Sequence, residues 1–175
     1  MTTGVRGVGV DIVDLGAFAA SLAEPGTRLT RAFSATERRQ CRERAESRGA
    51  RPGEATVSSS GASGASAPGT SGPAPARRED PLARHLAARW AAKEAVVKAW
   101  SAALYGEPPP IAPDLLRWSE IETVCDNWGR PSVRLGGEVA RQVAATIGEG
   151  ARWNVSLSHD GGSAIAFVVL EGPGG

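Results

Sequence analysis

The fold depends mainly on one stretch of the sequence, Arg89-Trp90-Ala91-Ala92-Lys93-Glu94-Ala95-Val96-Val97-Lys98-Ala99-Trp100. Its spacing predicts a helix, because at roughly 100° per residue the bulky apolar side chains form one stripe and alanines cover much of the remaining surface. Lys93 falls inside the apolar stripe, and Glu94 and Lys98 lie in the narrow seam beside it. Either Lys93 extends to solvent and Glu94 pairs with Lys98 along the helix, or these charges meet a buried partner or a ligand.

The composition is typical of one globular domain. The chain has 175 residues, of which 41% are hydrophobic and 22% are charged, enough for a single core. No apolar run approaches the ~20 residues of a membrane span, and the N-terminal residues lack the pattern of a secretory signal. We therefore expect a cytoplasmic protein without a membrane partner. The net charge of +1 gives no case for a nucleic-acid partner, and Cys41 and Cys125 lack the neighbours of a zinc site.

An alternating strand is predicted at Gly7-Val8-Gly9-Val10-Asp11-Ile12. Its three aliphatic side chains would face one side, and the two glycines and Asp11 would face the other. The glycines leave space beside Asp11, which suits a carboxylate that a ligand approaches. Glycine in a strand can equally mark a bulge, and an aspartate at a strand end can cap the next element. Asp14 is the expected N-cap of a short helix over residues 15–22.

An arginine-rich helix is predicted next. Ser34 and Glu37 have the spacing of a capping box, which places the start of this helix. Between Arg28 and Arg48 there are seven arginines and only three glutamates. This run is either an ordinary solvated face or a surface that attracts an acidic partner.

The remaining chain predicts an α+β domain. Residues 49–76 are rich in Ser, Gly, Ala and Pro and predict a disordered insertion within one domain that spans residues 1–175. After the long helix, the pattern predicts strands at 118–126 and 132–135, a helix at 138–147, and a hairpin with strands at 153–158 and 164–170. We expect a mainly antiparallel sheet packed against the long helix.

Three segments, read together and in order, resemble the 4′-phosphopantetheinyl transferases of the short, holo-acyl-carrier-protein synthase type. They are residues 7–12, residues 89–95 and Trp153-Asn154-Val155-Ser156-Leu157-Ser158-His159. Phe33-Ser34-Ala35-Thr36-Glu37 also resembles that family's F-T-x-x-E segment. The resemblance covers nearly the whole chain apart from the insertion. It implies that family's fold and a Mg²⁺-dependent transfer of phosphopantetheine from coenzyme A to a serine of an apo-acyl carrier protein, with release of adenosine 3′,5′-bisphosphate.

The resemblance also implies a set of site residues. Asp11 and Glu94 would be catalytic and would hold Mg²⁺, a cation that prefers oxygen ligands and is commonly bound by one or two carboxylates plus substrate phosphates. Lys98 would be catalytic, and with Lys93 it would bind the phosphates of coenzyme A. Either a carboxylate or a metal-bound water could take the proton of the carrier serine.

Further implied contacts concern the nucleotide, the carrier and the assembly. Arg89 and His159 would bind the nucleotide phosphates, and short members of the family are homotrimers with sites between subunits. Ala17 and Phe18 stand where relatives commonly carry basic residues that bind the carrier. We therefore expect an acidic helix of the carrier to dock on the arginines near Arg28–Arg48.

One departure from the family pattern leaves a second function open. The family's Gly-Thr-Gly loop is replaced here by Trp100-Ser101-Ala102-Ala103-Leu104-Tyr105-Gly106. The alternative is a non-catalytic homologue that binds coenzyme A or the carrier protein without turnover. Metal-dependent formation of holo-carrier would distinguish the two.

Overall fold

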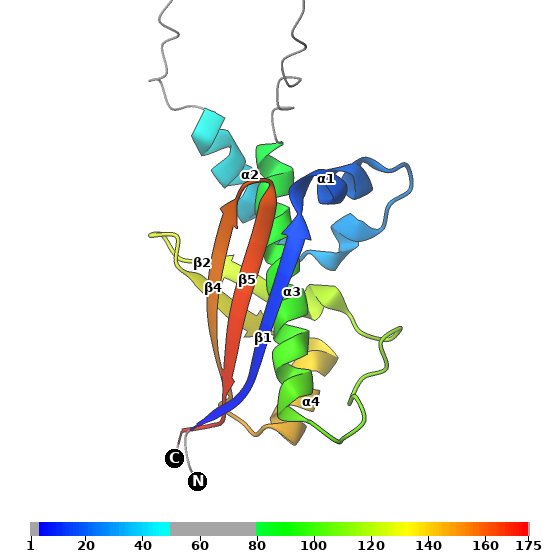
Figure 1. Cartoon of the computed structure of the whole chain (residues 1–175), viewed down its shortest axis with the longest axis vertical. Coiled ribbons are helices and arrows are strands. Elements are labelled where there is room, and N and C mark those ends of the chain that lie inside the picture. The colour runs from blue at the N-terminus through cyan, green and yellow to red at the C-terminus, as the bar shows by residue number, and fades with distance from the viewer. Residues whose placement is uncertain (1–3, 50–79, 175) are drawn as a thin grey trace, which may run out of the picture.

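The structure is a computed structural model that describes residues 4–49 and 80–174 (Figure 1). The insertion expected at about residues 49–76 lies outside the described residues, apart from Gly49. The elements are β1 (Val5–Asp14), α1 (Leu15–Ala23), η1 (Leu29–Ala32), α2 (Ala35–Gly49), α3 (Pro81–Ala103), η2 (Trp118–Glu120), β2 (Ile121–Cys125), β3 (Pro131–Leu135), α4 (Gly137–Thr146), β4 (Arg152–Asp160) and β5 (Ser163–Glu171).

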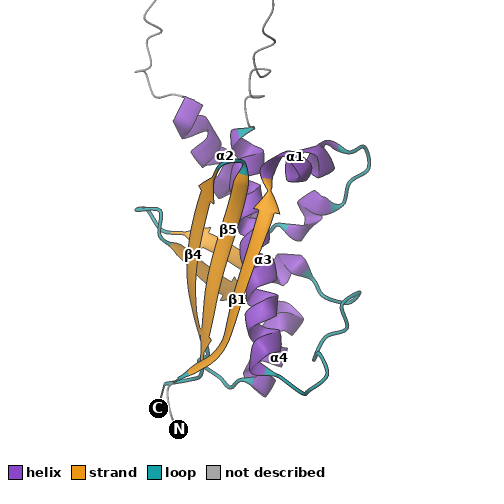
Figure 2. Ribbon diagram, viewed as in Figure 1, coloured by secondary structure: helices purple, strands orange, loops and turns teal. Residues whose placement is uncertain are grey.

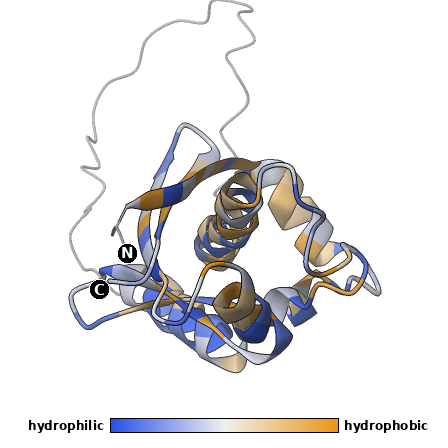
Figure 3. Ribbon diagram, turned by 90° about the horizontal axis from the view of Figure 1, so that it is seen from below, coloured by the Kyte–Doolittle hydropathy of each residue, from blue (hydrophilic) through white to orange (hydrophobic). Residues whose placement is uncertain are grey.

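The strands form two antiparallel sheets beside one long helix (Figure 2). In the larger sheet the order is β1-β5-β4, so β5 is central and β1 and β4 are the edges; β2 and β3 form a separate hairpin. α3 lies within the curve of the larger sheet (Figure 3). The predicted α+β class is confirmed, and one boundary is wrong, because residues 118–120 form a 3₁₀ turn before β2.

Local sequence signals set the helix starts. The Asp14 side chain accepts a hydrogen bond of 2.7 Å from Ala17 N–H and caps α1, as predicted. The capping box is also confirmed: Glu37 N–H donates to Ser34 Oγ at 3.1 Å, and Ser34 N–H donates to Glu37 Oε2 at 2.9 Å. Asp80 caps α3 and Pro81 occupies its first turn.

The glycines of β1 serve helix packing and leave no space for a ligand. A Cβ atom at Gly7 would collide with the carbonyl oxygen of Ala99, and one at Gly9 would collide with that of Ala95. The expectation of open space beside Asp11 is therefore wrong. Instead, the missing side chains let the backbone of β1 approach α3, which is lined by alanines on this side. This close approach brings Asp11 toward the helix that carries Glu94.

The alternation of β1 leaves an apolar face outside the sheet. Gly7, Gly9, Asp11 and Val13 face α3, so the other side chains of the strand point outward. On this outer side, the exposed apolar face consists of Val8, Val10, Ile12, Ile165 and Phe167, each 37–64% exposed. A contiguous apolar surface of this kind commonly marks an interface. Among the described residues, no helix has the length and apolar character needed to cross a membrane.

Candidate active site

Two acidic residues and a lysine meet where β1 crosses α3. Asp11 is buried, and its Oδ1 accepts a hydrogen bond of 2.8 Å from Lys98 Nζ, which also donates to the Val10 carbonyl at 3.1 Å. Glu94 lies one helical turn before Lys98 and is close enough to Asp11 for the two carboxyl groups to influence each other's ionisation. The structure therefore brings together three of the residues that the sequence singled out.

The carboxylates of Asp11 and Glu94 repel each other electrostatically. Partial burial, and then the hydrogen bond and the negative charge of Asp11, raise the pKa of Glu94 from its ordinary value of 4.5 to about 7; Lys98 opposes this shift. The hydrogen bond that Lys98 donates to Asp11 raises the pKa of Lys98. The second oxygen of Asp11, Oδ2, is buried without a hydrogen-bond partner among the described residues. A bound cation or a proton would neutralise part of the negative charge that Asp11 and Glu94 share.

Glu94 gives a pH-dependent stability that can be measured. Because its pKa is raised in the folded chain, its contribution to stability is full below pH 4.5 and is lost as the pH rises through about 7. Without metal, Glu94→Gln is expected to raise the melting temperature at pH 8 by ~2–4 °C, or roughly 1 kcal/mol after allowance for solvent screening. The gain should shrink at pH 5. An equal gain at both pH values in calorimetry would contradict the raised pKa.

Lys93 has a structural position. Its side chain is fully buried, and Nζ lies 2.8 Å from Glu37 Oε2, 3.0 Å from the Trp118 carbonyl and within hydrogen-bonding contact of the Ile121 carbonyl. Three acceptors match the three protons of an ammonium group. Burial lowers the pKa of Lys93, and Glu37 opposes that effect. The protein itself thus supplies the partners of the Lys93 ammonium group, and the expected contact between Lys93 and coenzyme A stays a prediction.

Arg89 and His159 lie together in a second, basic site. They line a cavity of about 170 Å³ with Arg44, His85 and Cys125. Arg89 is buried, donates to Cys125 Sγ at 3.0 Å, and keeps Nε unpaired within the described part of the chain. We call this pocket the basic cavity.

A neighbouring arginine fixes the ring of His159. Arg84 Nη2 lies 2.8 Å from His159 Nδ1. Because a guanidinium group only donates, Nδ1 must accept, and the ring proton is on Nε2. No pattern in the sequence indicated a role for Arg84, and none placed Arg44 at this cavity. A helix wheel could have placed Arg84 one to two turns from Arg89, but the partner on β4 depends on the tertiary fold.

The acidic and basic sites do not meet within one chain. Asp11 is on β1 and His159 is on β4, at opposite edges of the three-stranded sheet. On α3, Glu94 and Arg89 are five residues apart, which places them about 140° apart around the helix axis. The residues predicted to bind one substrate are therefore divided between two flanks of α3.

Comparison with known proteins assigns the family. A family model described as the 4′-phosphopantetheinyl transferase superfamily matches residues 62–168, more than half of the chain. The chain belongs to this superfamily. Among curated relatives of this transferase, the holo-[acyl-carrier-protein] synthase of Corynebacterium glutamicum is 39% identical over 163 residues, covering 93% of this chain and 96% of the relative. That of Bifidobacterium animalis subsp. lactis is 41% identical over 172 residues, covering 94% and 97%.

Solved structures agree with this assignment. The "Chronobacterium ammoniagenes ACPS-CoA complex" is 37% identical to this transferase, with a TM-score of 0.72 and coverage of 95% of this chain and 96% of that one. The acyl carrier protein synthase of Mycobacterium tuberculosis is 32% identical, with a TM-score of 0.61 and coverage of 97% and 100%. The predicted family and fold are confirmed.

The donor set of this transferase fits a magnesium ion. Asp11 and Glu94 supply carboxylate oxygens, and one of these, Asp11 Oδ2, is buried and unpaired. The described residues contain no group of three or more His, Cys, Asp or Glu side chains that could enclose a metal. Two carboxylates suit Mg²⁺, which is usually bound by one or two carboxylates while substrate phosphates and waters supply its other ligands.

Proposed function

We propose that this chain is a holo-acyl-carrier-protein synthase, which transfers 4′-phosphopantetheine from coenzyme A to a serine of an apo-acyl carrier protein. The observation that carries the proposal is the Asp11–Glu94 pair beside Lys98, in a chain whose curated relatives over almost the full length are holo-[acyl-carrier-protein] synthases. Phosphoryl transfer requires mainly positioning and neutralisation of charge, and this cluster can supply both.

The acidic cluster would act on the diphosphate. Asp11 and Glu94 would hold Mg²⁺, which when bound neutralises phosphate charge and aligns the reacting oxygens. Lys98 is half exposed and is tethered through Asp11 and the Val10 carbonyl. Its ammonium group would therefore be held in position to bind a phosphate oxygen and to stabilise the negative charge on the leaving nucleotide.

The basic cavity would bind the nucleotide. Arg44, Arg89 and His159 converge on it, and Arg89 offers an unpaired Nε–H. Guanidinium groups bind phosphate well because their planar array of donors matches its oxygens. The products would be holo-carrier and adenosine 3′,5′-bisphosphate.

A homotrimer would join the two sites. If the acidic cluster of one copy faces the basic cavity of the next, the contact joins two different surfaces, and contacts of that kind form a ring when the rotation between copies closes. The exposed apolar face supports an assembly, because its five side chains lie on β1 and β5, outside the core of one chain. The family resemblance favours three copies.

The assembly can be tested on the exposed apolar face. Phe167→Arg places a charge on a side chain that is 46% exposed in one chain, so the chain should fold. We expect it to become a monomer in light scattering and to lose most of its transfer activity, because the charge would have to be buried between copies. Asn154→Arg, on the exposed side of β4, is the matched control for the added charge. A fully active monomer of the parent chain would contradict the proposal.

The carrier would dock on the arginine run. Arg28, Arg31 and Arg38 are exposed, whereas Arg44 turns into the basic cavity. Reversing the three exposed arginines to glutamate should raise KM for the carrier by ~10-fold or more and weaken its salt dependence, because rim charges act mainly on association. The binding of coenzyme A should persist.

A matched triple variant controls for net charge. Arg117, Arg141 and Arg152 are exposed and lie outside the run. Their reversal to glutamate changes the net charge equally and should alter the carrier KM much less. If both triple variants behave alike, or if neither changes carrier kinetics, the run is an ordinary solvated face.

The function itself is tested by mass spectrometry of the carrier. Apo-carrier incubated with the chain, coenzyme A and Mg²⁺ should gain one phosphopantetheinyl group, and EDTA should prevent the gain. A non-catalytic homologue would bind coenzyme A without changing the carrier's mass. That result would favour the alternative function.

A further inference from the structure

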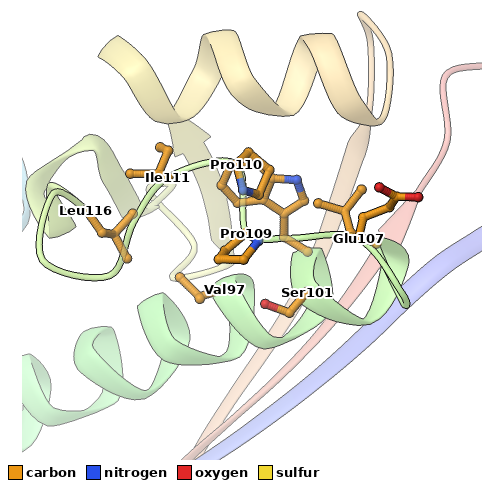
Figure 4. A pocket seen from close by; sticks show the side chains of 9 residues that line it. Val97, Ser101, Glu107, Pro109, Pro110, Ile111 and Leu116 are labelled. Carbon is orange, nitrogen blue, oxygen red and sulfur yellow. The ribbon is translucent and has the colours of Figure 1, made fainter.

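Two pockets along α3 differ in their chemistry. The pocket beside the C-terminal half of the helix is largely apolar, and Figure 4 shows Val97 and Ile111 among the side chains that line it. The basic cavity, of about 170 Å³, instead holds the guanidinium groups of Arg44 and Arg89 and the thiol of Cys125. None of the described residues that line it is acidic. A nucleophilic sulfur atom therefore lies in a cavity whose fixed charges are positive.

Hydrogen bonds to the backbone hold Cys125 in place at the end of β2. Its N–H donates to Gln40 Oε1 at 3.0 Å, and its carbonyl oxygen accepts from Gln40 Nε2 at 2.9 Å. This pair of bonds ties the end of β2 to α2. Cys125 is only half-buried and lines the cavity. A reagent that enters the cavity can therefore reach its sulfur atom.

Arg89 provides a second, independent indication that this cavity takes an anion. Its side chain is only 3% exposed, and its Nη2 donates to Cys125 Sγ at 3.0 Å. Within the described part of the chain, its Nε–H has no acceptor. A buried guanidinium group with an unused donor is unfavourable by itself, so an anionic group placed beside the sulfur would be stabilised.

The other cysteine of the chain serves as an internal comparison. Cys41 is fully buried, and burial raises the pKa of its thiol to about 11. Cysteines buried in apolar surroundings are inert, whereas reactive cysteines are partly exposed and lie in electropositive surroundings. The structure thus gives the second set of properties to Cys125 and the first set to Cys41.

We propose that Cys125 is a site of reversible S-thiolation by anionic low-molecular-weight disulfides, and that the added group blocks the basic cavity. The Cys125 thiol loses its proton to solvent, and its sulfur attacks one sulfur of the disulfide. A new S–S bond forms as the old one breaks, and the second half of the disulfide leaves as a thiolate. A thiol reductant reverses the exchange. The expected block of phosphopantetheine transfer rests on the proposed function, whereas the modification itself does not.

The charge of the cavity selects the disulfide. Glutathione disulfide carries a net negative charge, and its carboxylates can pair with Arg44 and Arg89. Cystamine carries two positive charges and would be repelled. Folding should therefore raise the ratio of the reaction rates at Cys125, glutathione disulfide over cystamine, by at least ~10-fold, the lower end of the effect of a charged cleft on the local concentration of a counter-ion. The chain unfolded in urea supplies the reference ratio.

The first test is peptide mapping by mass spectrometry of the parent chain treated with each disulfide. We expect one glutathione on Cys125, none on Cys41, and complete removal by dithiothreitol. A rate ratio at Cys125 equal to that of the unfolded chain would overturn the selection by charge. A folded chain that takes up no glutathione, or takes it up on Cys41 instead, would overturn the proposal as a whole.

Transfer activity is the second test, and each chain is compared with its own untreated sample. Glutathionylated parent chain should transfer at least ~10-fold more slowly, and dithiothreitol should restore the rate. Cys41→Ala should respond like the parent, whereas treatment should not change the rate of Cys125→Ser. If the untreated parent makes no holo-carrier, the proposed function fails, and the peptide map still decides the modification. If glutathionylated and untreated parent transfer equally fast, the modification does not block the cavity and that part of the inference is wrong.

Discussion

Asp11→Asn and Glu94→Gln are each expected to reduce the turnover of phosphopantetheine transfer by at least ~10²-fold, the scale of losing one preorganised electrostatic contact. Both changes keep the shape of the side chain and remove its charge. Neither should unfold the chain. Burial is the main reason that the pKa of Glu94 is raised, and the negative charge of Asp11 adds to it. Each variant removes the repulsion between the two carboxylates, so the metal-free fold should be as stable as the parent or more stable.

Matched controls separate the site from general charge effects. Asp114→Asn and Glu149→Gln make the same chemical changes at exposed positions outside the site and should keep the parent rate. The kinetics should be measured across a Mg²⁺ titration, with circular dichroism to verify folding. Parent-like transfer by folded Asp11→Asn and Glu94→Gln at every Mg²⁺ concentration would mean that the reaction occurs elsewhere.

Lys93→Met is expected to have the largest effect on stability. It leaves the carboxylate of Glu37 without its ammonium partner at a fully buried position, where loss of one member of an ion pair costs about 3–5 kcal/mol. Glu37 Oε1 also accepts from Thr123 N–H at 2.9 Å, so the carboxylate joins α2, α3 and β2. Loosening it should affect all three elements. Urea unfolding followed by tryptophan fluorescence would measure the change.

The double variant Glu37→Gln/Lys93→Met controls for the buried charge. It removes both charges, and the single amide oxygen can still accept one of the two backbone N–H bonds, from Thr123 or from Ser34, so part of the lost stability should return. A Lys93→Met chain within about 1 kcal/mol of the parent that fails to bind coenzyme A would instead support a ligand contact for Lys93.

The elements were predictable because their signals are local. Caps at Asp14 and Ser34, apolar periodicity in α3 and turn residues between β4 and β5 each act within a few residues. The unusual position of Lys93 within the apolar stripe of α3 was also visible, because it depends only on the local sequence pattern. Its partner was not predictable, because Glu37 is 56 residues away in sequence and meets it only through tertiary packing.

The site was predictable only in part, for a similar reason. The motifs identified Asp11, Glu94 and Lys98, and the fold brings them together. The glycines of β1 were misread, because their role depends on how closely α3 approaches. The division between the acidic cluster and the basic cavity depends on strand order, which no local pattern in the sequence specifies.

We propose that each active site combines the acidic cluster of one copy with the basic cavity of the next. It can be tested with mixed trimers of two inactive chains, Glu94→Gln and Arg44→Ala/His159→Ala, which carry different tags and are purified through both. In such a ring, one of the three directional contacts joins two intact halves.

The measurement is the transfer rate of the doubly purified mixed trimers in the holo-carrier assay. We expect about one third of the parent rate per trimer, although each variant alone is nearly inactive. A mixture as inactive as its components would contradict a site shared between copies, because it would mean that both halves of the site must come from the same chain.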